Sequence, residues 1–172
     1  MRYLLPAAAI AAVLTAMPAR ADDCGTLMNT MIAQASNPYP ATITMEIPGQ
    51  PARTTKAVFI HDTMYTQIEG KWRSLPMSAK ETAGMIRDAA KTAKESCHVQ
   101  GNDSVNGQSA TLYVAHVENK GSVSDNKVWV SGGKILKTEV QIQGGPHMVT
   151  VLDYANVAPP AGATPIGPPP QH

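Results

Sequence analysis

Near the start of the chain apolar residues recur every three or four positions, and this spacing predicts a helix from Cys24 to Ala35. Asp22 or Asp23 can cap its first turn. The helix is expected to end at Asn37-Pro38, because the residue before a proline is driven out of the helical conformation. One face of this helix would be buried, and it consists of Cys24, Leu27, Met28, Met31, Ile32 and Ala35.

A second helix is predicted after Ser78, because Ser78 and Glu81 have the spacing of a capping box. Its apolar face is narrow and rich in alanine, so we expect this helix to lie close against a sheet. The residues expected to face the core are Thr82, Met85, Ile86, Ala89, Ala90 and Ala93. Cys97 follows the last turn, where it is well placed to reach the first helix.

Most of the remaining chain alternates between apolar and polar residues, which is the period of a strand covered on one side. In the segment 41–47, for example, every odd-numbered residue is apolar and every even-numbered residue is polar. Turn sequences separate such segments, and Asn106-Gly107 is a strong hairpin signal. The expected strands are 41–47, 54–61, 64–69, 110–118, 126–131, 136–143 and 148–154. The pattern predicts an α+β fold with an antiparallel sheet that has one covered face.

The first 21 residues have the features of a cleavable export signal. Arg2 precedes an apolar run from Leu4 to Met17, and Ala19-Arg20-Ala21 offers small residues at the positions that a signal peptidase recognises. The run is shorter than the roughly 20 residues that span a bilayer, so a retained membrane anchor is the weaker interpretation. We therefore expect a periplasmic protein with no transmembrane segment in its mature form.

Cleavage after residue 21 leaves two cysteines, Cys24 and Cys97. In an oxidising compartment an even pair predicts a disulfide. The competing interpretation is a redox-active or metal-binding thiol, but neither a C-x-x-C motif nor a histidine at ligand spacing accompanies them. A lipid anchor on Cys24 would need small apolar residues before it, where this chain has Asp22 and Asp23.

The mature chain has the size of one domain and almost no net charge. The signal contains two of the 14 basic residues and no acidic one, so 12 basic residues remain against 13 acidic ones. This balance gives no electrostatic attraction for nucleic acid or an anionic membrane. We expect a single domain over 22–158 and a disordered tail over 159–172, because the tail is too rich in proline to form a core.

No catalytic motif, cofactor motif or metal site is recognisable. The five histidines (His61, His98, His116, His147 and His172) never occur at the i, i+4 spacing of a zinc-binding helix. His116 lies in a predicted strand, where a satisfied core or edge residue is the simpler interpretation. His61 and Asp62 are adjacent, and neighbouring strand residues point to opposite faces. We therefore do not expect an enzyme, and we expect no cofactor.

Two segments resemble the periplasmic lipoprotein-carrier superfamily, which comprises LolA/LolB-like and LppX-like proteins. The segment from Met64 to Trp72 is similar to the strand, turn and tryptophan that precede that family's helical lid. The segment 127–140 is similar to its central strand pair. The resemblance covers about Cys24 to Pro159, and it lacks an equivalent of the arginine with which carriers hold the lid closed.

The resemblance implies a strongly curved, unclosed barrel whose concave face is covered by two helices, with an apolar cavity between sheet and helices. From strand alternation alone, the candidate lining residues are Ile43, Met45, Val58, Ile60, Leu112, Val114, Val128, Val130, Val140 and Ile142. The same residues fit an ordinary packed core. Trp72 and Trp129 fit a ligand site or a core in the same way.

Two functions follow from this reading. The first is a periplasmic binding or carrier protein for an apolar ligand, such as a lipid or the acyl chain of a lipoprotein. The second is a protein-interaction module, such as an inhibitor, chaperone or envelope-assembly accessory, that uses an outer sheet face or a strand edge to contact an envelope partner.

Overall fold

The computed structural model describes residues 21–60, 62–155 and 157–166, so residues 1–20 of the expected export signal, His61 and the end of the tail lie outside the described residues. The helices are α1 (Ala21–Gln34) and α2 (Ala79–Thr92). The strands are β1 (Tyr39–Glu46), β2 (Arg53–Ile60), β3 (Thr63–Ile68), β4 (Lys71–Pro76), β5 (Lys94–Val105), β6 (Gln108–Asn119), β7 (Ser122–Ser131), β8 (Lys134–Ile142), β9 (His147–Leu152) and β10 (Thr164–Pro165).

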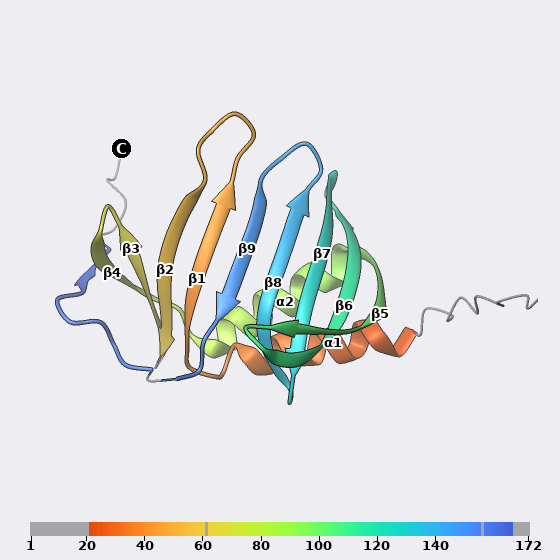
Figure 1. Cartoon of the computed structure of the whole chain (residues 1–172), viewed down its shortest axis with the longest axis horizontal. Helices are drawn as coiled ribbons and strands as arrows, with labels where there is room; N and C mark the ends of the chain where they lie inside the picture. Colours follow the sequence, from red (N-terminus) through yellow and green to blue (C-terminus); the bar gives the residue numbers. More distant parts are fainter. Residues whose placement is uncertain (1–20, 61, 156, 167–172) are drawn as a thin grey trace, which may run out of the picture.

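All ten strands form a single sheet in the order β10-β4-β3-β2-β1-β9-β8-β7-β6-β5. Within it, β1 to β4 form one antiparallel meander and β5 to β9 form another. Antiparallel pairing of β1 with β9 joins the two meanders, and the only parallel pair in the described part is β10 with β4. The sheet is curved and does not close (Figure 1). The predicted α+β class with a curved, open antiparallel sheet is confirmed.

Both helices lie on one face of this sheet, behind the strands in Figure 1. α1 contacts β5, β6 and β8, and it buries Leu27 to 2 % exposure against Cys97, Ala115 and Val128. The predicted disulfide is confirmed, because Cys24 of α1 is bonded to Cys97 of β5. The helix is therefore attached to the sheet both by a covalent bond and by apolar packing.

In two details the helices differ from the prediction. Asp23 lies inside α1, and its carboxylate accepts a hydrogen bond from the backbone N–H of Val99 in β5 instead of capping the helix. The capping box of Ser78 and Glu81 is present at the start of α2, but Met85 is 59 % exposed. α2 packs mainly on α1, and its buried residue is Ala83, so its covered face is rotated from the one predicted.

Part of the predicted disordered tail is paired with the sheet. Thr164 and Pro165 pair with Arg73 and Ser74 of β4, and the Thr164 hydroxyl accepts a hydrogen bond from Arg73 at 2.7 Å. The backbone N–H of Ile166 donates to the Ser74 carbonyl oxygen. The segment after β9 therefore runs along one end of the sheet and reaches its far edge (Figure 1).

β5 is not among the strands expected from the sequence, and β6 is longer than the predicted strand 110–118; the two form a hairpin that bends over the sheet. The pairing shifts by one residue between Val99 and Gly101, and Gly101 has a φ of 148°. A bulge of this kind bends a strand pair and increases its twist. The end of the hairpin consequently lies over the face of the sheet that the helices leave open (Figure 1).

Candidate functional site: a cleft on the open face of the sheet

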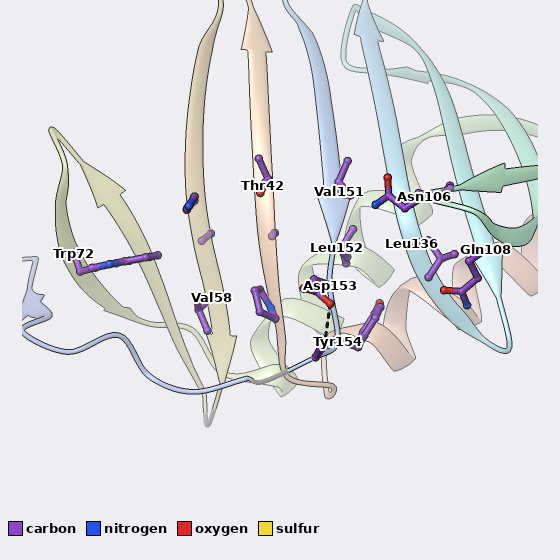
Figure 2. A pocket seen from close by; sticks show the side chains of 16 residues that line it. Thr42, Val58, Trp72, Asn106, Gln108, Leu136, Val151, Leu152, Asp153 and Tyr154 are labelled. Atoms are coloured by element: carbon purple, nitrogen blue, oxygen red, sulfur yellow. Dashed lines mark hydrogen bonds between the residues drawn. The ribbon is translucent and has the colours of Figure 1, made fainter.

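A cleft of about 760 Å³ lies on the sheet face opposite to the helices. The strands β1, β2, β8 and β9 form its floor, Trp72 of β4 stands at one end, and the β5–β6 hairpin stands at the other (Figure 2). Its apolar lining includes Ala57, Val58, Trp72, Val105, Leu136 and Val151, and its polar lining comprises Thr42, Lys56, Asn106, Gln108 and Asp153. This volume lies within the range of about 300–1,000 Å³ that is typical of ligand pockets.

Strand register explains how residues from distant parts of the chain share the floor of the cleft. Lys56 is opposite Thr42, Thr42 is opposite Val151, and Val151 is opposite Lys137. The row continues to Trp129, which is opposite Lys137. Directly opposite residues of neighbouring strands point to the same side of a sheet. These five side chains therefore form one row across the open face.

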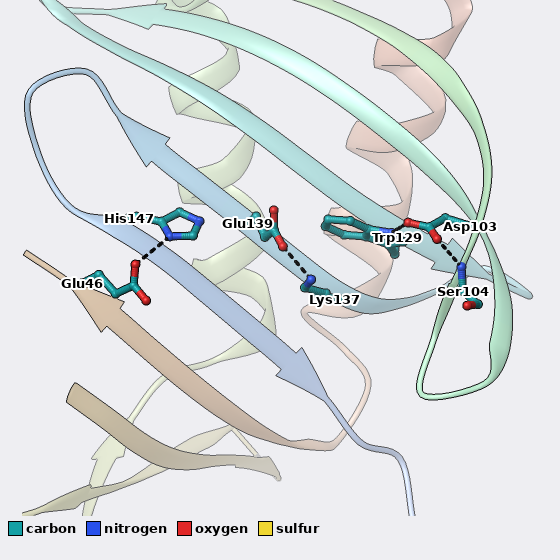
Figure 3. Close-up of polar contacts among 7 residues, drawn as sticks. All are labelled: Glu46, Asp103, Ser104, Trp129, Lys137, Glu139 and His147. Atoms are coloured by element: carbon teal, nitrogen blue, oxygen red, sulfur yellow. Dashed lines mark hydrogen bonds and ion pairs between the residues drawn. The ribbon is translucent and has the colours of Figure 1, made fainter. Parts of the chain in front are cut away.

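The wall at the hairpin end is held in place by a buried tryptophan. The Trp129 side chain donates from its Nε1 to Asp103 Oδ2 at 2.8 Å (Figure 3). This hydrogen bond, followed by one from the Ser104 backbone N–H, holds the pKa of Asp103 below its usual value. Asn106 has a φ of 51° and Gly107 one of 81°, which are backbone angles that Asn-Gly accommodates in tight hairpins. The tip of the hairpin is thus fixed where Asn106 lines the cleft.

Tyr154 forms part of the cleft wall and also bonds to α1. Its hydroxyl oxygen lies 2.6 Å from the Gln34 side-chain oxygen and 2.6 Å from the Ile135 carbonyl oxygen. A phenol has one proton and cannot donate to both. Both contacts are satisfied if the Gln34 amide is turned over, so that its NH₂ donates to Tyr154 and Tyr154 donates to Ile135. Burial raises the pKa of Tyr154 to about 12, so this hydroxyl keeps its proton near neutral pH.

Beyond the cleft the same face becomes polar. His147 Nδ1 of β9 lies 3.3 Å from Glu46 Oε2 of β1, and Lys137 is paired with Glu139 within β8 (Figure 3). His116 is exposed there, and its Nδ1 lies 2.8 Å from Asp125. The hydrogen bond to this carboxylate raises the pKa of His116. The open face therefore combines apolar and polar groups at the cleft and has ion pairs at its other end.

A second, smaller cavity of about 330 Å³ lies between the end of α1, the start of α2 and β2. Its lining includes Tyr39, Phe59, Ile60, Met77 and Thr82. The rings of Tyr39 and Phe59 are stacked with their centroids 4.8 Å apart, and burial raises the pKa of Tyr39 to about 12. This cavity is on the helix side, where the resemblance placed the ligand, but it has less than half the volume of the cleft.

The ten predicted lining residues are divided between the two faces. A row of opposite pairs runs from Met45 through Met148, Val140, Asn126 and Ala115 to Cys97, which places Met45 and Val140 on the helix side. Ile43, Val128, Val130 and Ile142 lie on that side too. Val58, Leu112 and Val114 lie on the open face, and Ile60 lines the smaller cavity. Of the ten, only Val58 lines the cleft.

Neither Thr42 nor Lys56 was predicted to line a cavity, because each is a polar residue in an alternating strand. Alternation assigned polar residues to water, and the cleft lies on that wet face of the sheet. Asn106 and Gln108 were identified only as hairpin residues, because nothing in a hairpin sequence indicates which surface its tip will cover. Trp72 was one of two tryptophans considered for a ligand site, and the structure places it in the cleft lining.

Two further features bear on possible chemistry. The one group of three potential metal-ligating side chains found among the described residues is Cys24, Glu95 and Cys97, and both of its sulfurs are used in the disulfide. No helix in the described part of the chain is long and apolar enough to cross a membrane.

No protein-family model and no curated protein sequence matches the chain. Solved structures with a similar course of the chain include LprF from Mycobacterium bovis, with a TM-score of 0.46 and 11 % identity over 84 % of this chain and 100 % of that one. MucB, solved in complex with MucA(peri), has a TM-score of 0.46 and 16 % identity over 82 % of this chain and 58 % of that one. A LolA superfamily protein, NE2245 from Nitrosomonas europaea, has a TM-score of 0.24 and 8 % identity over 75 % of this chain and 90 % of that one.

These identities and TM-scores are too low to place the chain in any of these families. Similarity at this level concerns the fold alone, and it assigns no ligand to this chain.

Proposed function

We propose that this chain is an exported binding protein that holds the apolar part of a lipid-like ligand, such as an acyl chain, in the cleft on the open face of the sheet. The observation that carries the proposal is the cleft itself, with a volume of about 760 Å³ and with Val58, Leu136, Val151 and Trp72 in its lining. The disulfide supports export, because such bonds persist in oxidising compartments.

The physical basis of binding would be removal of apolar surface from water. Each methylene group of a chain that is buried against the cleft contributes about 0.8 kcal/mol. The floor belongs to a sheet whose neighbouring strands are paired along their length, so little ordering is needed when a ligand enters. A preformed cleft of this size, in which polar groups stand beside apolar ones, is the usual form of a small-molecule site.

Trp72 allows a direct test, since it lines the cleft. Stearate with a nitroxide quencher on its chain should quench part of the protein fluorescence, and Trp72→Phe should remove that part. Val151→Glu should abolish binding, because it places a carboxylate on the cleft floor. Val149→Glu is the matched control, since Val149 lies on the same strand and the same face but does not line the cleft.

Native mass spectrometry of protein purified from a periplasmic fraction would complete the test. We expect co-purifying lipid with the wild type and with Val149→Glu, and none with Val151→Glu. Absence of lipid and of quenching in the wild type would contradict the proposal, as would equal binding by both glutamate variants.

One observation favours the alternative of a protein-interaction module. β5 is an edge strand of 12 residues, and no described strand pairs with its outer side. An extended partner segment can add to such an edge through main-chain hydrogen bonds. Protection of β5 amides from hydrogen exchange by an envelope partner, with no change in Trp72 fluorescence, would support this role instead.

A further inference from the structure

The cleft is lined by two charged residues, Lys56 and Asp153, and they differ in what they contact. Asp153 Oδ1 accepts a hydrogen bond from the Ala155 backbone N–H at 2.9 Å. Lys56 has neither an ion pair nor a hydrogen bond from its side chain among the described residues. The ammonium group of Lys56 is therefore the positive charge at the cleft that is available to a ligand.

Lys137 shows the contrast in the same row of the sheet. It is paired with Glu139, and its Nζ lies 4.4 Å from the centroid of the Trp129 ring. A carboxylate and an aromatic face already stabilise this charge. Among the described residues no comparable partner is present beside Lys56, whose opposite residue in β1 is Thr42.

The surroundings of Lys56 change from apolar to polar along β2. Val58, two residues further along the strand, also lines the cleft, whereas Thr54, two residues back on the same face, is exposed. An apolar chain over Val58 would thus bring the group at its end near Lys56. On the opposite wall, Asn106 and Gln108 offer amide groups that can donate to oxygen.

We propose that the cleft selects amphiphiles with an anionic head group, a carboxylate or a phosphate, and that Lys56 is the residue that recognises this charge. The inference rests on the proposed function, since it assumes that the cleft holds the apolar tail. A hydrogen bond between an ammonium and an anionic oxygen is roughly twice as strong as a neutral one.

Ligands with one tail and different head groups test the proposal. Dodecyl phosphate, laurate, dodecanol and dodecyltrimethylammonium would be compared for displacement of the uncharged fluorescent probe N-phenyl-1-naphthylamine from the full chain. We expect both anions to bind more tightly than dodecanol and the cation to bind most weakly. Lys56→Gln should weaken binding of the anions about 10-fold, a factor that corresponds to about 1.4 kcal/mol, and should leave dodecanol unchanged.

Lys127→Gln is the matched control, because Lys127 lies on the same face of the sheet but does not line the cleft. It changes the net charge equally and should not alter the order of affinities. Lys56→Arg keeps the charge and should retain the preference for anions. Unchanged circular dichroism would show that each variant is folded.

The possible outcomes separate this inference from the proposed function. If neither the probe nor any dodecyl compound binds, the proposed function fails. If dodecanol binds as tightly as the anions, or if Lys127→Gln weakens the anions as much as Lys56→Gln does, the role of Lys56 is refuted. Inorganic phosphate alone should not displace the probe at the same concentration, and displacement by it would also overturn the inference, because the site would then not require a tail.

Discussion

Tyr154 contacts more of the molecule than its place just after the last long strand suggests. It packs against both groups of buried apolar residues, one that includes Leu27 and one that includes Trp129. Its hydroxyl is hydrogen-bonded to Gln34 of α1 and to Ile135 of β8. Gln34 is only 5 % exposed, and one end of its amide has no partner among the described residues. Among the described residues, the hydrogen bond with the Tyr154 hydroxyl is therefore the one that the buried side-chain amide of Gln34 makes.

Tyr154→Phe should lower the free energy of unfolding by about 1–3 kcal/mol, since it leaves a buried polar group without a hydrogen bond. Urea denaturation followed by circular dichroism would measure the change. Tyr113→Phe is the control, because Tyr113 packs on the same core and its hydroxyl has no hydrogen bond among the described residues.

Adding Gln34→Leu to Tyr154→Phe should recover part of the loss, because both polar partners are then replaced by apolar groups. An equal loss in the two tyrosine variants, or no recovery in the double variant, would show that the hydroxyl contributes nothing.

The helix α1 depends on its attachment to the sheet. It has 14 residues, and isolated helices of this length are marginal in water. Leu27 packs into the core, Asp23 accepts a hydrogen bond from Val99, and Cys24 is bonded to Cys97. The hydrogen bond and the disulfide attach the start of α1 to β5, Leu27 attaches it to the core of the sheet, and the Gln34 contact with Tyr154 attaches its end.

Replacing both cysteines by alanine should lower the free energy of unfolding by about 4 kcal/mol, the chain-entropy value for a loop closed over a separation of 73 residues. The midpoint of urea unfolding would measure this loss. Addition of a reductant to the wild type should reproduce it and should not affect the alanine variant. A double variant as stable as the wild type would mean that packing alone holds α1.

In the whole molecule, two apolar cores lie on opposite faces of one sheet. The core under the helices includes Ala115 and Val128, and the core under the β5–β6 hairpin includes Trp129 and Leu136. Val128 and Trp129 are neighbours in β7, so the same strand supplies both cores. Loss of either core should disrupt the strands that support the other.

We therefore expect the domain to unfold in one cooperative transition. In Trp72→Phe the remaining tryptophan is Trp129, whose fluorescence reports on the core under the hairpin, while far-ultraviolet circular dichroism reports on the whole sheet. The two signals should have the same urea midpoint, and removal of the disulfide should shift both equally. A separate, earlier fluorescence transition would show instead that the hairpin unfolds independently.

The local features of this protein were determined by its sequence. Helical spacing located α1, the capping box located the start of α2, cysteine parity predicted the disulfide between Cys24 and Cys97, and period-two alternation located most of the long strands. In β1 alternation also separated the apolar side of the strand from its polar side. These features depend on residues that are close together in the chain, so a single sequence contains the information.

The cleft was decided only by tertiary structure. It requires β1 to pair with β9, which brings Thr42 beside Val151, and it requires a bulge at Gly101 that carries Asn106 over the open face. Alternation states which residues share a face, but it does not state which distant strands become neighbours or how the sheet bends. For this reason the apolar residues chosen from sequence mostly pack under the helices, whereas the polar residues Thr42 and Lys56 line the cleft.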